Sequence, residues 1–94
     1  MAADVLAVGA LAALREMAVA VPNEVQVIGF DGIPLGRYTV PPLSTILQDS
    51  EVTAAIITDE LLRLRAGAPA PRHVILPVEF IERESTLPIK RPLL

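Results

Sequence analysis

Apolar side chains are concentrated in a few short stretches, and the first of these covers residues 4–19. Asp4 is suited to cap the start of a helix there. One apolar stripe of this helix would consist of Leu6, Ala10, Ala13, Leu14 and Met17, and much of the remaining surface would be Val5, Val8, Leu11 and Ala12. Beyond Asp4, only Arg15 and Glu16 are charged. A helix that is apolar nearly all round is buried on both sides. We therefore expect one side to pack on a sheet and the other on a second subunit.

Two short segments have the character of strands. Residues 25–30 show little alternation of apolar and polar positions, as is typical of buried parallel strands. Residues 44–47 are expected to be extended, after a loop over residues 32–42 that is rich in proline and glycine. No strand is evident before the first helix. The chain is therefore expected to open within a βαβ unit, with Met1 not a natural domain start.

A second helix is expected from Asp49 or Ser50 to Arg65. Asp49 and Glu51 lie at its start, where acidic side chains complement the helix dipole. The sequence Ala-Gly-Ala-Pro over residues 66–69 ends it, with glycine and proline in the positions where they commonly stop a helix.

The C-terminal part of the chain predicts one further strand. It would cover residues 73–80 with an interruption at Pro77, and residues 81–86 would extend beyond it. The last eight residues are expected to form a loose tail. Strands that alternate with helices in this way predict an α/β fold with a parallel sheet.

Composition adds a second indication of missing partners. The chain has 94 residues, of which 52% are hydrophobic, and its mean hydropathy is +0.52. A domain of this size buries only roughly 60–65% of its unfolded surface. It has too little interior for so much apolar surface, so we expect burial against further chain or a partner subunit.

Charge and cysteine content exclude several classes of function. The net charge is −3 and the eight basic residues are scattered, which argues against nucleic-acid binding by this stretch. With no cysteine, neither a disulfide framework nor a thiolate metal site is possible. The apolar N-terminus lacks the basic start of a signal peptide, and no apolar run reaches membrane-spanning length. We expect a cytoplasmic protein without a membrane partner.

The residues that could carry catalysis are few. His73 is the only histidine, and no G-x-S-x-G nucleophile motif is present for it to serve. It is more simply an exposed residue at the entry to a strand. The five glycines form neither a phosphate-binding loop nor a dinucleotide fingerprint. We expect no enzyme activity, no catalytic residue, no cofactor and no metal site.

Asp31 is the strongest candidate for ligand binding. It follows the strand at residues 25–30, and ligands of open α/β sheets bind beyond the carboxyl ends of strands. An aspartate in this position can equally form an Asx turn or cap a loop, and local chemistry leaves the two alternatives open. Gln48, just before the second helix, could also be a capping or solvent-facing residue.

Four segments resemble, in order and in spacing, the C-terminal part of the lactose-repressor/galactose-repressor (LacI/GalR) family of regulators. They are ADVLAVGALAAL, VPNEVQVIGFD, RYTVPPLSTILQ and VEFIERESTLP. The resemblance covers about residues 3–87. It implies a fragment of a type I periplasmic-binding-protein-like effector-binding core, in which two Rossmann-like lobes are joined by crossover strands and hold the effector between them.

The resemblance also implies roles for individual residues. Asp31 matches the aspartate of the family's G-[FY]-D motif, which hydrogen-bonds the effector, and Gln48 matches the crossover glutamine of the cleft. Asp4 matches the aspartate of an Asn-Asp pair and is the third implied effector-binding residue. Ala3 stands where the family has an effector-binding asparagine, so a donor and an acceptor for a typical sugar are missing.

By the same resemblance, the outer side of the first helix forms a homodimer interface through Val8 and Ala12, joined by the loop around Tyr38. The implied layout is given by range: 1–41 in the C-terminal lobe, 42–48 as interlobe crossover, 49–77 in the N-terminal lobe, 78–87 as return strand and 88–94 as tail. DNA would be bound only through a helix-turn-helix absent from this chain.

We therefore expect a C-terminal fragment of the ligand-sensing and dimerisation domain of a LacI-type regulator. A small polar effector such as a sugar would control operator affinity by shifting the lobes between two arrangements. Two alternatives remain: a fragment of a periplasmic-type sugar-binding transport protein, and a stand-alone dimeric interaction module. An upstream helix-turn-helix would exclude the first alternative, and a well-ordered monomer in light scattering would count against the second.

Overall fold

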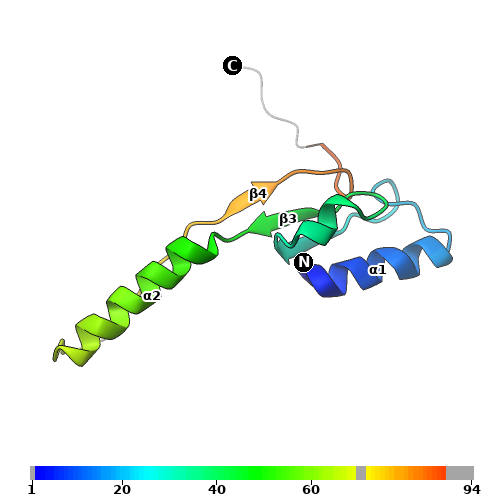
Figure 1. Cartoon of the computed structure of the whole chain (residues 1–94). Coiled ribbons are helices and arrows are strands. Elements are labelled where there is room, and N and C mark those ends of the chain that lie inside the picture. Colours follow the sequence, from blue (N-terminus) through cyan, green and yellow to red (C-terminus); the bar gives the residue numbers. More distant parts are fainter. Residues whose placement is uncertain (1, 70–71, 89–94) are drawn as a thin grey trace, which may run out of the picture. The chain divides into compact units, whose positions relative to one another are not determined.

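A computed structural model describes residues 2–69 and 72–88, which form a four-stranded sheet, two α-helices and one short 3₁₀ helix (Figure 1). The elements are β1 (Ala2–Ala3), α1 (Asp4–Glu16), β2 (Ile28–Asp31), η1 (Pro34–Arg37), β3 (Ser44–Leu47), α2 (Ser50–Arg65) and β4 (Glu79–Ile81). The chain divides into two compact units. The first unit contains residues 2–47 and 79–88, and the second contains residues 48–78.

The sheet belongs to the first unit and has the strand order β1-β2-β3-β4. The first three strands are parallel, and β4 runs antiparallel to β3. The predicted α/β class with a parallel sheet is confirmed. Because β1, β2 and β3 point the same way, their carboxyl ends lie along one edge of the sheet.

Two sequence-based expectations about these strands are wrong. A strand does precede α1: β1 pairs with β2 at Ala2↔Gly29 and Ala3↔Phe30. It is only two residues long, too short to leave a hydrophobic pattern. The strand expected over residues 25–30 instead begins at Ile28 and continues through Asp31. The segment before it is fixed from outside the sheet, since the Val27 amide donates to the Ser85 carbonyl oxygen at 3.0 Å.

Helix α1 packs on the sheet through one narrow face. Ala7 and Leu11 are buried and form the core of the unit with Leu43, which precedes β3. On another side of the helix, Val8 is half-buried and Ala12 is exposed. The expected burial of one face against a sheet is confirmed, and the covering of the other face by a second subunit stays a prediction.

Both ends of α1 differ from expectation. The residue before the helix is Ala3, and no side chain caps the start, so the prediction of Asp4 as the cap is wrong. Asp4 is the first helical residue, and its carboxylate turns inward to partners described below. The helix stops at Glu16 rather than near residue 19, because Ala18 adopts φ +58°, which a right-handed helix cannot continue.

The return segment after β4 is fastened to the sheet by hydroxyl groups. Ser85 is fully buried; its hydroxyl donates to the Val27 carbonyl at 2.6 Å and accepts from the Ser44 amide at 2.8 Å. The Arg83 amide donates to the Ser44 hydroxyl at 2.8 Å. These bonds take the place of a regular strand ladder and hold residues distant in sequence in one layer.

The second unit consists of α2 and the segment that follows it. Helix α2 has the predicted bounds, and Asp49 caps it by accepting hydrogen bonds from the Glu51 and Val52 amides at 3.0 and 3.2 Å. The strand expected over residues 73–80 is wrong in its first part, because only Glu79–Ile81 pairs with another strand. Pro77 has no amide hydrogen to donate, and Ile75 is 96% exposed.

No helix within residues 2–69 and 72–88 is long and apolar enough to cross a membrane. Of the tail expected over residues 88–94, only residue 88 lies within the described part of the chain.

Candidate functional site

The candidate site is the sheet edge at which β1, β2 and β3 end. β1 ends at Ala3, which pairs with Phe30 of β2. β2 continues for one more residue and ends at Asp31. Asp31 is in turn the register partner of Leu47, the last residue of β3. The fold therefore places the strongest candidate residue at the edge where open parallel sheets hold their ligands.

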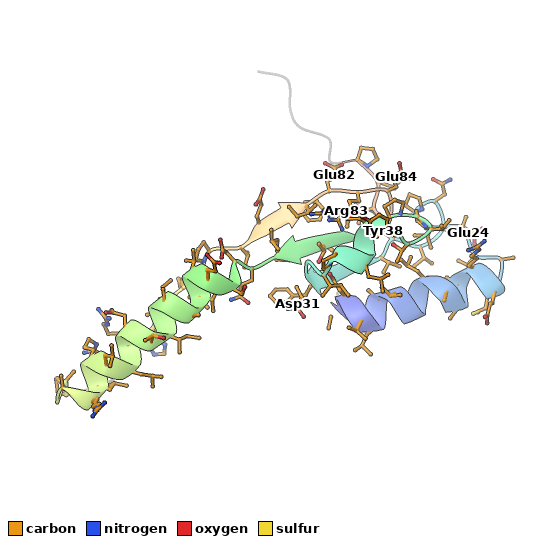
Figure 2. All side chains as sticks on the ribbon, viewed as in Figure 1. Glu24, Asp31, Tyr38, Glu82, Arg83 and Glu84 are labelled. Carbon is orange, nitrogen blue, oxygen red and sulfur yellow. The ribbon has the colours of Figure 1, made fainter. Side chains whose placement is uncertain are left out.

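Asp31 is presented to solvent in an unusual backbone conformation. Its φ is +120° and that of the following Gly32 is +76°. Positive φ is free for glycine but costs an aspartate on the order of 1–3 kcal/mol. The Asp31 side chain is exposed at the end of the sheet (Figure 2), and no group in the described part of the chain hydrogen-bonds to its carboxylate. Both oxygens are thus available to accept hydrogen bonds from a ligand.

Asp4 lies directly beneath this edge and is fully buried. One carboxylate oxygen accepts a hydrogen bond from the Ile33 amide at 2.8 Å, and the other accepts from the Thr45 hydroxyl at 2.7 Å. Asp4 also lies in close contact with the position that a Cβ would occupy at Gly29. Direct contact between Asp4 and an effector stays a prediction. The contacts present in this structure are internal.

Gln48 follows β3 directly and is the first residue of the second unit. Its side chain is half-buried. Its predicted role in an effector cleft is untested.

The three residues predicted at a dimer interface come together in the first unit. Val8, Ala12 and Tyr38 line one shallow groove of about 230 Å³ between α1 and the loop after η1. Tyr38 is 76% exposed and Val40, which lines the same groove, is 65% exposed. The Thr39 hydroxyl shapes this loop by donating to the Gly36 and Pro41 carbonyl oxygens at 3.1 and 2.9 Å.

Sequence reasoning missed four residues that line this groove, namely Leu11, Arg15, Thr39 and Val40. Arg15 lies seven residues after Val8 on α1, a spacing of two helical turns, so helical periodicity could have identified it. No local pattern pointed to Val40. It reaches the groove because the fold brings the loop after η1 next to Leu11 and Arg15 of α1.

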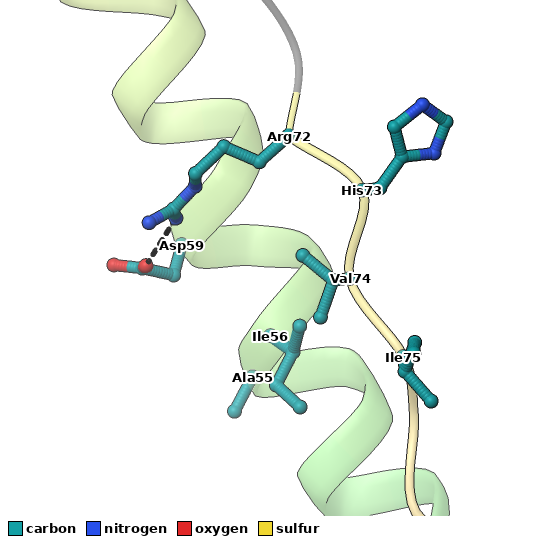
Figure 3. Close-up of a pocket in the computed structure, with 7 residues that line it drawn as sticks. All are labelled: Ala55, Ile56, Asp59, Arg72, His73, Val74 and Ile75. Carbon is teal, nitrogen blue, oxygen red and sulfur yellow. Dashed lines mark ion pairs between the residues drawn. The ribbon is translucent and has the colours of Figure 1, made fainter.

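A larger hollow of about 580 Å³ lies in the second unit, between α2 and residues 72–75 (Figure 3). It is lined mostly by apolar side chains, including Ala55, Ile56 and Val74. His73 points away from α2, which agrees with its interpretation as an exposed residue. Within residues 2–69 and 72–88, no group of three or more acidic or histidine side chains is arranged to hold a metal.

Beside this hollow, Glu60 ties the segment at Arg72 to α2. It accepts hydrogen bonds from the Arg63 guanidinium at 2.6 and 3.1 Å, from the Arg72 amide at 3.0 Å and from the Arg72 guanidinium at 2.8 Å. The Arg63 hydrogen bonds, followed by the Arg72 amide, lower the pKa of Glu60 from 4.5 to about 2. Arg72 also pairs with Asp59 at 3.6 Å. This cluster secures a segment that lacks sheet hydrogen bonds.

Comparisons with protein families, with curated proteins and with solved structures agree with one another. Residues 1–86 match the family described as a periplasmic binding protein-like domain. The chain is 33% identical over 82 residues to the "Lactose operon repressor" of Rhizobium radiobacter, covering 87% of this chain and 73% of that protein. It is 38% identical over 87 residues to the "HTH-type transcriptional regulator MalR" of Streptomyces coelicolor, covering 90% of this chain and 25% of that protein.

Among solved structures, the chain is similar to the lac repressor dimer bound to operator and the anti-inducer ONPF. The TM-score is 0.79 at 34% identity, and the match covers 92% of this chain and 30% of that one. The chain thus spans nearly three quarters of the Rhizobium radiobacter repressor and about a quarter of the Streptomyces coelicolor regulator. The relatives are transcriptional regulators and not enzymes.

Proposed function

Because this chain belongs to the periplasmic-binding-protein-like family, as part of the effector-binding core of LacI/GalR-type transcriptional regulators, we propose that it supplies one wall of a sugar-effector site. We propose further that it supplies a dimer surface to such a regulator. Effector binding would change the affinity of the whole regulator for its operator. The matched relatives are transcriptional regulators, which favours this function over a transport protein.

The observation that carries the proposal is the exposed Asp31 carboxylate at the edge shared by three parallel strands. A carboxylate accepts hydrogen bonds from two neighbouring hydroxyl groups at once, which suits a sugar. A strained residue at a strand end is also common where a binding group must be held in one orientation. Both properties support Asp31 as the effector contact. By family resemblance alone, Gln48, just beyond β3, is proposed as a second one.

Ala3 is expected to narrow the choice of effector. It lies at the end of β1, one strand away from Asp31, and is exposed. A methyl group there offers neither a donor nor an acceptor, so a hydroxyl of the ligand facing it would lose a partner. We propose an effector whose surface at this point is apolar or lacks a hydroxyl.

The proposed lobe layout assigns residues 1–41 to the C-terminal lobe, 42–48 to the crossover, 49–77 to the N-terminal lobe and 78–87 to the return strand. The division into two compact units, with boundaries at residues 47–48 and 78–79, supports this assignment. The chain leaves the first unit after β3 and returns to it at β4, which pairs antiparallel with β3.

The groove lined by Val8, Ala12 and Tyr38 is the proposed homodimer surface. Its exposed apolar side chains support this role, because large apolar groups gathered on one face usually mark an interface. Operator DNA would be bound through a helix-turn-helix outside these residues. A protein acting on bacterial operators would work in the cytoplasm.

The test uses the complete gene product that contains this chain. Lactose, D-galactose and D-ribose would be titrated separately by calorimetry into the wild type and Asp31→Ala. At least one sugar should bind the wild type. Loss of charge-assisted hydrogen bonds should weaken its binding by roughly 10- to 100-fold in Asp31→Ala. Operator binding without sugar should be unchanged.

The matched control is Glu24→Ala, which removes an exposed carboxylate elsewhere in the same unit. Glu24→Ala should bind sugar and respond to it like the wild type. Equal sugar affinity in Asp31→Ala and the wild type would remove Asp31 from the effector site.

A further inference from the structure

The carboxylate of Asp4 lies in the interior of the first unit, whereas that of Asp31 is exposed. It is fully buried, although it belongs to the first residue of a helix, where an aspartate normally faces water or caps the backbone. Burying a carboxylate is costly unless its hydrogen bonds are supplied by the protein. The groups that supply them therefore show what the residue holds in place.

Those groups come from the loop after β2 and from β3. The Ile33 amide, 29 residues away in sequence, donates to one carboxylate oxygen at 2.8 Å. The Thr45 hydroxyl, 41 residues away and itself fully buried, donates to the other at 2.7 Å. Asp4 thus joins the start of α1 to the loop after β2 and to the middle of β3.

The loop joined in this way is the one that carries Asp31. Asp31 and Gly32 both have positive φ, and Ile33 is the first residue after them with extended backbone. A strained conformation persists only where the surroundings hold it. The pairing of β2 with β3 fixes the chain up to Asp31. The hydrogen bond from the Ile33 amide to Asp4 fixes the chain after Gly32.

The position of Asp4 is itself closely determined. Gly29 in β2 provides the space, because its missing Cβ would lie against an Asp4 carboxylate oxygen and 3.0 Å from Leu43 Cδ2. The carboxylate is therefore enclosed by β2, β3 and the loop.

We propose that Asp4 is a positioning residue for effector binding. It fixes the backbone of residues 31–33, and in this way it aims the Asp31 carboxylate at the ligand without touching the ligand itself. The inference rests on the proposed function of Asp31, and it assigns Asp4 a different role from the direct effector contact implied by family resemblance.

The first experiment needs no variant. A scalar coupling between the Ile33 amide nitrogen and the Asp4 carboxyl carbon, measured by NMR on the isotope-labelled 94-residue chain, would detect the hydrogen bond directly. We expect this coupling together with slow amide exchange at Ile33. If the coupling is absent and the Ile33 amide exchanges as fast as an exposed loop amide, the proposal is overturned.

The second experiment compares Asp4→Ala with Asp4→Asn and Leu11→Ala. Asparagine can still accept from the Ile33 amide with its carbonyl and donate to the Thr45 hydroxyl with its amide. Asp4→Ala should speed Ile33 exchange by at least about tenfold, as expected when a buried hydrogen bond is lost. It should also change the three-bond HN–Hα coupling of Asp31, which reports φ. Asp4→Asn should restore both values.

Leu11→Ala is the control for general destabilisation, because Leu11 is a buried residue of the same helix, away from the loop. It should lower stability and leave the Asp31 coupling unchanged. A purely structural role for Asp4 predicts that Asp4→Ala and Leu11→Ala behave alike at Asp31, and that outcome contradicts the proposal.

The same variants in the complete gene product separate this inference from the proposed function. With whichever of lactose, D-galactose or D-ribose binds the wild type, Asp4→Ala should lose affinity and Asp4→Asn should recover most of it. If Asp31→Ala binds that sugar normally, the proposed function fails while the NMR result still decides the loop geometry. If Asp31→Ala loses the sugar but Asp4→Ala keeps it, only the positioning role fails.

Discussion

At the scale of single residues, the candidate site combines an exposed acid with a strained backbone. Asp31 has φ +120°, a value that L side chains adopt rarely and only at a cost. A residue retained in such a conformation is better explained by a task for its side chain than by stability. The strained backbone and the family resemblance point independently to the same aspartate.

The strain leads to a prediction for Asp31→Gly. Glycine removes the steric cost but adds flexibility to the unfolded chain, so the net gain in the free energy of unfolding should be roughly 0.5–2 kcal/mol. Asp31→Ala removes the same carboxylate and keeps the strain. Urea denaturation of both variants is the measurement, and a glycine variant no more stable than the alanine variant would contradict the strain argument.

Gly29 gives a second prediction at this scale. In Gly29→Ala, the new Cβ would collide with the Asp4 carboxylate and press on Leu43. Overpacking of this kind should lower the free energy of unfolding by about 1–3 kcal/mol. The matched control is Gly9→Ala in α1, where nothing lies within 4 Å of the added methyl group. Gly9→Ala should raise stability by roughly 0.5–1 kcal/mol, because alanine is the better helix former.

At the scale of elements, the two helices are stabilised in different ways. α1 packs on the sheet through Ala7 and Leu11, whereas α2 has no buried residue in this chain. Helices without a packed face depend on caps and on pairs within the helix. In α2 these are the Asp49 cap and the Glu60–Arg63 pair. The same Glu60 fastens the segment at Arg72.

The low pKa of Glu60 predicts a pH dependence of this attachment. The pKa of about 2 in the folded chain lies below the ordinary value of 4.5, so folding favours the charged carboxylate. Its stabilising contribution is complete above pH 4.5 and is lost as the pH falls towards 2. The Arg72 amide signal, followed by NMR across this range, should report the release of the segment.

Glu60→Gln should abolish most of that pH dependence, since glutamine does not titrate. Asp59→Asn is the matched control, because Asp59 meets Arg72 at 3.6 Å with its side chain 79% exposed, whereas Glu60 meets it at 2.8 Å. Exposed pairs of that kind contribute little. If Asp59→Asn alters the Arg72 titration more than Glu60→Gln does, the attachment has been assigned to the wrong acid.

At the scale of the whole molecule, the chain exposes more apolar surface than a small domain usually does. Val5, Leu6, Met17, Tyr38 and Val40 are all more than 60% exposed in the first unit alone. This agrees with the excess hydrophobicity seen in the composition. Of these residues, Tyr38 and Val40 line the groove proposed as the dimer surface.

Val8→Lys tests that surface in the complete gene product. A lysine in the groove would place a charge in an apolar interface, so the sedimentation mass should shift from dimer towards monomer. Leu6→Lys adds the same charge to the opposite side of α1 and should leave the mass unchanged. A Val8→Lys protein that stays dimeric would show that this face of α1 is not the interface.

Local patterns in the sequence predicted much of the fold. The bounds of α2 follow from neighbouring residues, because helix initiation and termination are interactions over a few positions, whereas the cap by Asp49 is seen only in the structure. β3 lies at residues 44–47 as expected. The α/β class and the position of Asp31 at a strand end also follow from the order of apolar segments, and the family membership from spaced motifs.

Tertiary structure alone decided the rest. The sequence could not show that β1 exists, since two residues carry no pattern, nor that residues 73–78 lack a strand partner. It suggested a capping role for Asp4, which the fold replaces with hydrogen bonds to Ile33 and Thr45. Those partners are 29 and 41 residues away.

The sequence by itself determined which residues carry groups that can bind an effector, because that depends on the chemistry of the side chain. The fold decided which are free to do so, because burial and hydrogen-bond partners depend on residues brought together from distant parts of the chain.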